Sequence, residues 1–187
     1  MAEKKKEYVF NREFYELNGL KTFIKFKSNP FGIGKALLAF VEFDTNTKKM
    51  VKSIDVYVDI PKMLVFCNDC LSGKLPKEAA AAAKKNPKFP PAVYQVLGGF
   101  DKDGKTYSRT LKFGASSKEG NFCFQAELAP GKRDEKGLIQ STGKFESRII
   151  VPCSKDNLKE LCLVFQTEYN AWLSSCYMKA EKSKFKK

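Results

Sequence analysis

Lysine and aromatic residues alternate along residues 20–28, a stretch whose composition fits a β-strand. In strand geometry Lys21, Phe23, Lys25 and Lys27 share one face, while the residues between them, two of them large and apolar, share the other. Lysines neutralise phosphate groups, and an exposed aromatic ring stacks on bases of any identity. The pattern therefore fits a strand face that binds single-stranded nucleic acid, although an ordinary solvated strand with one phenylalanine has the same pattern.

The second half of the chain carries a weaker version of the same combination. Tyr107 and Arg109 alternate on one strand face, Lys112 lies on the opposite face, and Arg148 follows on a later strand. Recurrence in both halves favours a binding surface over a solvated face. We expect phosphate contacts from the lysines and base stacking from two aromatic rings; the lysines are Lys21, Lys25, Lys27 and Lys35, and the rings are Phe23 and Tyr107.

Other chemistry finds little support in the sequence. The chain has no histidine, which excludes Ser-His and Cys-His nucleophiles and imidazole-based zinc sites. Cys67 and Cys70 have C-x-x-C spacing, but no second pair follows, so we interpret them as buried apolar residues. Asp55 and Asp59 share a strand face without a second acidic motif that would complete a two-metal site. We therefore predict no enzyme activity, no bound metal and no cofactor.

The elements that position these residues form one supersecondary unit that occurs twice in the sequence. In residues 8–73, strands near 20–28, 35–43 and 54–60 lead through Pro61 into a short amphipathic helix. Such a β-meander followed by a helix defines an α+β class of fold.

Residues 92–178 repeat that order. Residues 101–104 predict a hairpin turn, residues 130–142 a long polar loop, and Ser154 the N-cap of a final helix. Apolar residues then recur at three- and four-residue steps over 158–176, which predicts a helix packed along one stripe.

Two segments lie outside these units. Residues 74–91 are rich in alanine, proline and lysine and predict either a short solvated helix or a flexible connector. Residues 179–187 form a basic tail that we expect to add non-specific affinity. The whole chain of 187 residues is predicted to be a single domain.

The net charge of +13 favours a polyanionic partner. Residues 179–187 contribute +4 and residues 1–7 contribute +1, so +8 belongs to the body of the chain. The composition leaves open a solubilising surface, a protein module that docks an acidic partner, and an RNA-binding protein. The sequence shows neither a signal-like segment nor a long apolar span, so we expect a cytoplasmic protein with no membrane contact.

Residues 33–38 read Ile-Gly-Lys-Ala-Leu-Leu. This segment resembles the Lys-Gly-Lys-Ala-Ala-Leu motif that opens the second strand of the Whirly family of single-stranded DNA-binding proteins, with departures at Ile33 and Leu37. Residues 149–173 resemble the last strand and helix of that family, whose fold is related to transcriptional positive cofactor four. The order of elements is similar across nearly the whole chain.

The resemblance implies two antiparallel four-stranded sheets packed roughly crosswise, with helices that mediate homo-oligomers, commonly tetramers. It also implies that single-stranded DNA lies along sheet edges with little sequence preference, and it adds Gly34 and Lys35 to the candidate site. The chain is further similar to small proteins of bacterial mobile elements, which favours a role in handling single-stranded intermediates.

Overall fold

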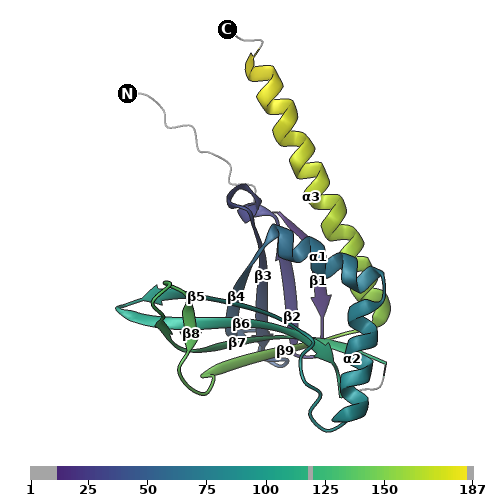
Figure 1. The fold of residues 1–187 in the computed structure, drawn as a ribbon, viewed down its shortest axis with the longest axis vertical. Helices are drawn as coiled ribbons and strands as arrows, with labels where there is room; N and C mark the ends of the chain where they lie inside the picture. Colours follow the sequence, from purple (N-terminus) through teal and green to yellow (C-terminus); the bar gives the residue numbers. More distant parts are fainter. Residues whose placement is uncertain (1–11, 118–119, 185–187) are drawn as a thin grey trace.

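The computed structural model describes residues 12–117 and 120–184, with side chains as far as residue 178 (Figure 1). The first half contains β1 (Glu13–Asn18), β2 (Thr22–Lys27), the 3-10 helix η1 (Asn29–Ile33), β3 (Lys35–Phe43), β4 (Met50–Asp59), α1 (Ile60–Leu71) and α2 (Lys74–Lys85). The second half contains β5 (Tyr94–Lys102), β6 (Lys105–Ala115), β7 (Phe122–Arg133), β8 (Ile139–Ser141), β9 (Ser147–Cys153) and α3 (Lys155–Lys184).

The strands form two antiparallel sheets. Sheet 1 has the order β1-β2-β3-β4, and sheet 2 has the order β5-β6-β7, with both β8 and β9 paired to β7. The two sheets run roughly crosswise, and the ends of β5 to β8 project past β4 (Figure 1). The prediction of an α+β fold with two packed antiparallel sheets is confirmed, except that sheet 2 has five strands.

Phenylalanine side chains join the two sheets to α1. The Phe26 ring of β2 meets Phe124 of β7 at 6.5 Å, and Phe66 of α1 lies 5.3 Å from Phe113 and 5.8 Å from Phe124. All of these rings are buried. Because side chains alternate along a strand, burial of one face forces the charged residues between the core positions onto the outer face of each sheet.

Strand β1 was not expected, because its residues do not alternate cleanly. A register shift between Glu13 and Tyr15 interrupts the pairing with β2, and a bulge of this kind breaks the period of two. Only Leu17 of this strand is fully buried, while Phe14 packs partly against the core. The consequence is a row of acidic side chains beside the lysines of β2.

The prediction of a long polar loop at residues 130–142 was wrong. Strand β7 continues to Arg133 and pairs with β8, while the Asp134 carboxylate accepts hydrogen bonds from the turn backbone. Gly99 and Gly131 let Ile139 pack closely, since a Cβ at either position would stand less than 3 Å from the Ile139 side chain. Polar residues form strands here because tertiary contacts outweigh their composition.

The helices follow the sequence in part. Residues 74–85 form α2, which is the helical alternative of the two stated for residues 74–91, although Leu75 and Ala79 bury one face of it. Ser154 caps α3 as predicted, with its hydroxyl accepting from the Asn157 backbone N–H at 3.1 Å. Helix α3 runs into the expected basic tail as far as Lys184, and residues 185–187 lie outside the described residues.

In the described part, no helix combines the length and the apolar character that a membrane span requires.

Candidate nucleic-acid interface

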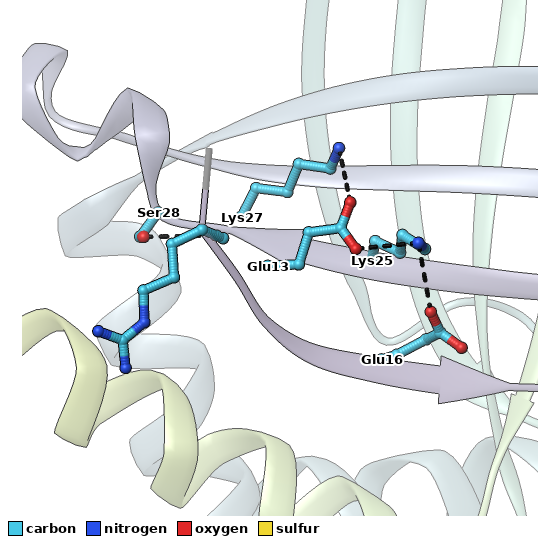
Figure 2. Close-up of polar contacts among 6 residues, drawn as sticks. Glu13, Glu16, Lys25, Lys27 and Ser28 are labelled. Atoms are coloured by element: carbon cyan, nitrogen blue, oxygen red, sulfur yellow. Dashed lines mark hydrogen bonds and ion pairs between the residues drawn. The ribbon is translucent and has the colours of Figure 1, made fainter. Parts of the chain in front are cut away.

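The lysines of β2 lie on the outer face of sheet 1 and contact glutamates of β1. The Lys25 ammonium is 2.9 Å from Glu13 and 3.6 Å from Glu16, and the Lys27 ammonium is 3.1 Å from Glu13. Figure 2 shows Glu13 between the two lysines. Hydrogen bonds from Lys25 and Lys27 lower the pKa of the Glu13 carboxyl. Both predicted phosphate ligands are therefore neutralised by the neighbouring strand.

Lys35, at the start of β3, is also paired with a carboxylate. It forms an ion pair with Asp59, which also contacts Lys62 at 3.0 Å. Gly34, the residue before Lys35, has the left-handed conformation, with φ of +72°, and ends η1. The Asp59 carboxylate therefore offsets positive charge at this end of β3.

Lys21 and Phe23 lie at the opposite end of this face. Lys21 is exposed at the turn before β2, and its backbone carbonyl accepts a hydrogen bond from the Phe43 N–H. Phe23 is half-buried, with its ring 5.9 Å from Phe43 and the Lys25 ammonium 5.6 Å above it. The Phe23 ring therefore already packs against neighbours within the chain.

Lys112 and Arg148 lie together on the outer face of sheet 2. Lys112 stands opposite Gln125, and Arg148 stands opposite Glu127, on three adjacent strands. They line a groove of about 620 Å³ that the segment before β5 closes on one side. We call this the sheet 2 groove and define it by Lys88, Phe89, Lys112, Gln125, Arg148 and Ile150.

The sheet 2 groove combines exposed rings with cations. Phe89 is 71% exposed with the Lys88 ammonium 5.7 Å from its ring, and the exposed ring of Phe145, outside the groove lining, has the Arg148 guanidinium 4.5 Å from its centroid. Lys112 pairs with Glu127 at 2.6 Å. Within the described residues neither Lys88 nor Arg148 contacts a carboxylate. This face therefore offers unpaired positive charge beside exposed aromatic surface.

Tyr107 and Arg109 point to the other face of sheet 2, beyond the end of the core. They line a cleft of about 400 Å³ against the free edge of β4, together with Ser53, Asp55, Phe100 and Lys102. We call this the β4-edge cleft. The rings of Phe100 and Tyr107 stack at 5.4 Å and 20°, and the Arg109 guanidinium carbon lies 3.7 Å from the Phe100 centroid. The predicted residues are thus divided among three surfaces.

The Arg109 side chain is half-buried without a neutralising contact. Among the described residues it has neither an ion pair nor a hydrogen bond through its guanidinium. Burial lowers the pKa of this group, and the charge of Asp55 partly offsets the effect. Arginine stays protonated under such shifts. The cleft therefore holds a cation whose five N–H donors are available.

The cysteines and carboxylates form no comparable site. Cys67 and Cys70 are buried on α1 as expected, and Cys162 of α3 lies beside them. Hydrogen bonding with Cys162, and to a lesser extent burial, raises the pKa of both thiols. In residues 12–117 and 120–178, no group of three or more cysteine, aspartate or glutamate side chains is arranged to hold a metal ion.

Several residues of these surfaces escaped the sequence interpretation. Phe89 and Lys88 lie in the segment interpreted as a connector, and Phe100 and Lys102 alternate at the predicted hairpin turn. Arg109, which contacts the Phe100 ring, belongs to another strand. The adjacent Lys88-Phe89 pair and the alternation of Phe100 with Lys102 were the available signals.

Similarity to known proteins is limited to distant structural likeness. No protein-family model and no curated protein matches the chain. A crystal structure of WHY1 from Arabidopsis thaliana is 10% identical, covers 86% of this chain and 89% of that chain, and has a TM-score of 0.47. A 32 kDa fragment of the flagellar hook protein FlgE from Caulobacter crescentus is 14% identical, covers 75% and 68%, and has a TM-score of 0.17.

Both TM-scores lie below 0.5, and we draw no functional conclusion from either likeness. Membership of the Whirly family stays a prediction from residues 33–38 and the order of elements.

Proposed function

We propose that this chain is a non-enzymatic protein that binds single-stranded DNA across the sheet 2 groove. The observation that carries the proposal is the exposed Phe89 ring beside Lys88 and Arg148, on a groove where these two cations have no carboxylate partner among the described residues. Lysine and arginine neutralise phosphates, while exposed rings stack on unpaired bases. Gln125 adds an amide on the groove floor that can hydrogen-bond a base edge.

A single strand fits this groove better than a duplex does. Stacking on Phe89 and Phe145 requires an unpaired base, and a duplex keeps its bases stacked on one another. The contacts come from side chains spread over β6, β7 and β9, which favours a strand crossing the sheet with little sequence preference. The smallest set of contacts that this proposal requires consists of two rings and two cations, namely Phe89, Phe145, Lys88 and Arg148.

The sheet 1 residues form a second, weaker contact surface in this proposal. Lys25, Lys27 and Lys35 would have to exchange a carboxylate for a phosphate, so each contributes less than an unpaired cation. Lys21 and Phe23 complete this surface, with Gly34 at its end. Homo-oligomeric assembly and a cytoplasmic location stay predictions from the sequence.

The test is fluorescence anisotropy with labelled single- and double-stranded oligonucleotides of equal length, as DNA and as RNA, over a salt series. Single-stranded DNA should bind more tightly than duplex, and log K should fall by about 0.7 per phosphate contact for each unit of log salt. Phe89→Ala should cost about 1–3 kcal/mol. Tyr177→Ala, at a ring 66% exposed on α3, is the matched control.

Equal affinity for single and double strands contradicts base stacking and would favour the acidic-partner alternative. Tighter binding of RNA than of the matched DNA would reassign the ligand to RNA, since the 2′-hydroxyl is what distinguishes the two.

A further inference from the structure

The β4-edge cleft is smaller than the sheet 2 groove. It has about 400 Å³ of volume and is lined by two sheets, on one side by Ser53 and Asp55 of β4 and on the other by Phe100 and Arg109. A volume of this size suits one drug-sized molecule. The cleft can therefore hold a small ligand or the end of a chain.

Gly98 leaves open space on the sheet beside the cleft residues Phe100 and Arg109. It stands opposite Arg109, on the same face as Val96 and Phe100. A Cβ at Gly98 would meet only the Arg109 carbonyl oxygen, at 3.9 Å. Val96 is buried in the core, whereas Gly98 is exposed, so the core ends at this position and the cleft begins.

The cleft contains charged groups of both signs. Arg109 and Lys102 supply positive charge, and Asp55 and Glu146 supply carboxylate acceptors. Within the described residues none of these four forms an ion pair. A ligand that satisfies this set carries an anion and several hydrogen-bond donors.

The rings add a third requirement. The Phe100 and Tyr107 rings stack at 20°, and the Arg109 guanidinium carbon lies 3.7 Å from the Phe100 centroid, so three planar groups adjoin one another. Planar stacks of aromatic rings and guanidinium extend readily onto a further flat ring. The ligand should therefore contain a flat heterocycle as well as an anion.

We propose that the β4-edge cleft binds one nucleotide with a terminal phosphate monoester, its phosphate on Arg109 and Lys102 and its base against the Phe100–Tyr107 stack. Guanidinium binds phosphate in a bidentate manner, and a carboxylate commonly accepts from ribose hydroxyls in nucleotide sites. Asp55 and Glu146 supply such acceptors. The nucleotide is either a free nucleoside monophosphate or the phosphorylated end of a strand. The site stands whether or not the sheet 2 groove binds DNA.

The experiment is isothermal titration calorimetry of the full chain with the four nucleoside 5′-monophosphates, adenosine and inorganic phosphate. At least one monophosphate should bind, with adenosine and phosphate each at least tenfold weaker. Arg109→Gln should weaken that monophosphate at least tenfold, and Gly98→Val should abolish its binding by crowding the neighbouring Phe100 and Arg109 side chains. Lys159→Gln, at an exposed lysine of α3, should leave it unchanged.

Circular dichroism melting of each variant shows whether it is folded, and Gly98→Val leaves every charge in place if Arg109→Gln does not fold. Absence of binding by all four monophosphates overturns the proposal, as does binding that survives both variants. Oligonucleotides with a 5′-phosphate and a 5′-hydroxyl separate the two sources. A preference for the 5′-phosphate that Arg109→Gln removes assigns the strand end, and equal binding of the two assigns the free nucleotide.

Discussion

The outer faces of the two sheets carry the same kinds of residue with different electrostatic results. On sheet 1, Lys25 and Lys27 stand beside Phe23, but Glu13 and Glu16 of the next strand contact the lysines (Figure 2). On sheet 2, Lys112 also pairs with a glutamate, but Arg148 lies against Phe145 and has no carboxylate contact in the described part of the chain.

The comparison shows that the charge of a strand face is decided by the adjacent strands. Exposed ion pairs add little stability, about 0–1 kcal/mol, yet they remove the positive potential that attracts a polyanion. Lysine alternation along one strand is therefore weaker evidence for a nucleic-acid site than unpaired cations beside exposed rings from several strands.

The largest expected effect on DNA affinity comes from removing the binding residues of one sheet face and then those of the other. Phe89→Ala with Arg148→Ala should weaken single-stranded DNA binding by about 1–3 kcal/mol for the lost stack, roughly 5- to 150-fold, and further for the lost phosphate contact. Lys25→Ala with Lys27→Ala should cost less than about threefold, because both lysines are already paired. Anisotropy titrations at one salt concentration measure both. A larger loss from the sheet 1 pair would reverse the comparison.

A smaller effect is expected from freeing the lysines of sheet 1. Glu13→Gln with Glu16→Gln removes their partners, so DNA binding should tighten at low salt and the salt slope should steepen by up to about 1.4, or 0.7 for each new phosphate contact. Glu78→Gln with Glu135→Gln changes the net charge equally at sites away from these lysines. The same gain from both pairs would mean that only net charge matters.

The smallest effect concerns the pH dependence of stability. The lysines depress the pKa of Glu13 below its ordinary value of 4.5 in the folded state. A carboxyl group whose pKa is lower in the folded state stabilises the fold at pH values above its ordinary pKa. This contribution is lost as the pH falls through the pKa of the folded state. Because the pair is largely exposed, the contribution is about 0–1 kcal/mol.

Thermal melts of the wild type and Glu13→Gln at pH 7 and pH 3 measure this contribution. The melting temperature of the variant should be slightly lower than that of the wild type at pH 7, and this difference should shrink at pH 3. A difference as large at pH 3 as at pH 7 would show that Glu13 acts through something other than its charge.

Much of the fold was predictable because the relevant signals are local. The turn at Asp103-Gly104, the cap at Ser154 and the buried alternation of β4 each depend on residues close in sequence. Strand β1 was missed because a register shift breaks its alternation, and β8 was missed because Ile139 packs over two glycines from other strands.

The candidate site was less predictable, because its pairings cross the chain. Ion pairing of Lys25 with Glu13 and stacking of Arg109 on Phe100 depend on strand register, which no short motif encodes. The sequence could identify cations and rings, but it could not say which of them face a carboxylate and which face an open surface.

Photo-crosslinking tests most directly whether the strand lies on sheet 2. A single-stranded oligonucleotide containing 5-iodouracil forms adducts with aromatic rings that stack on the modified base, and peptide mapping identifies the residue. Our account predicts adducts at Phe89 or Phe145. Adducts confined to Phe23 on sheet 1, or no adduct on either sheet under conditions where the oligonucleotide is bound, would contradict it.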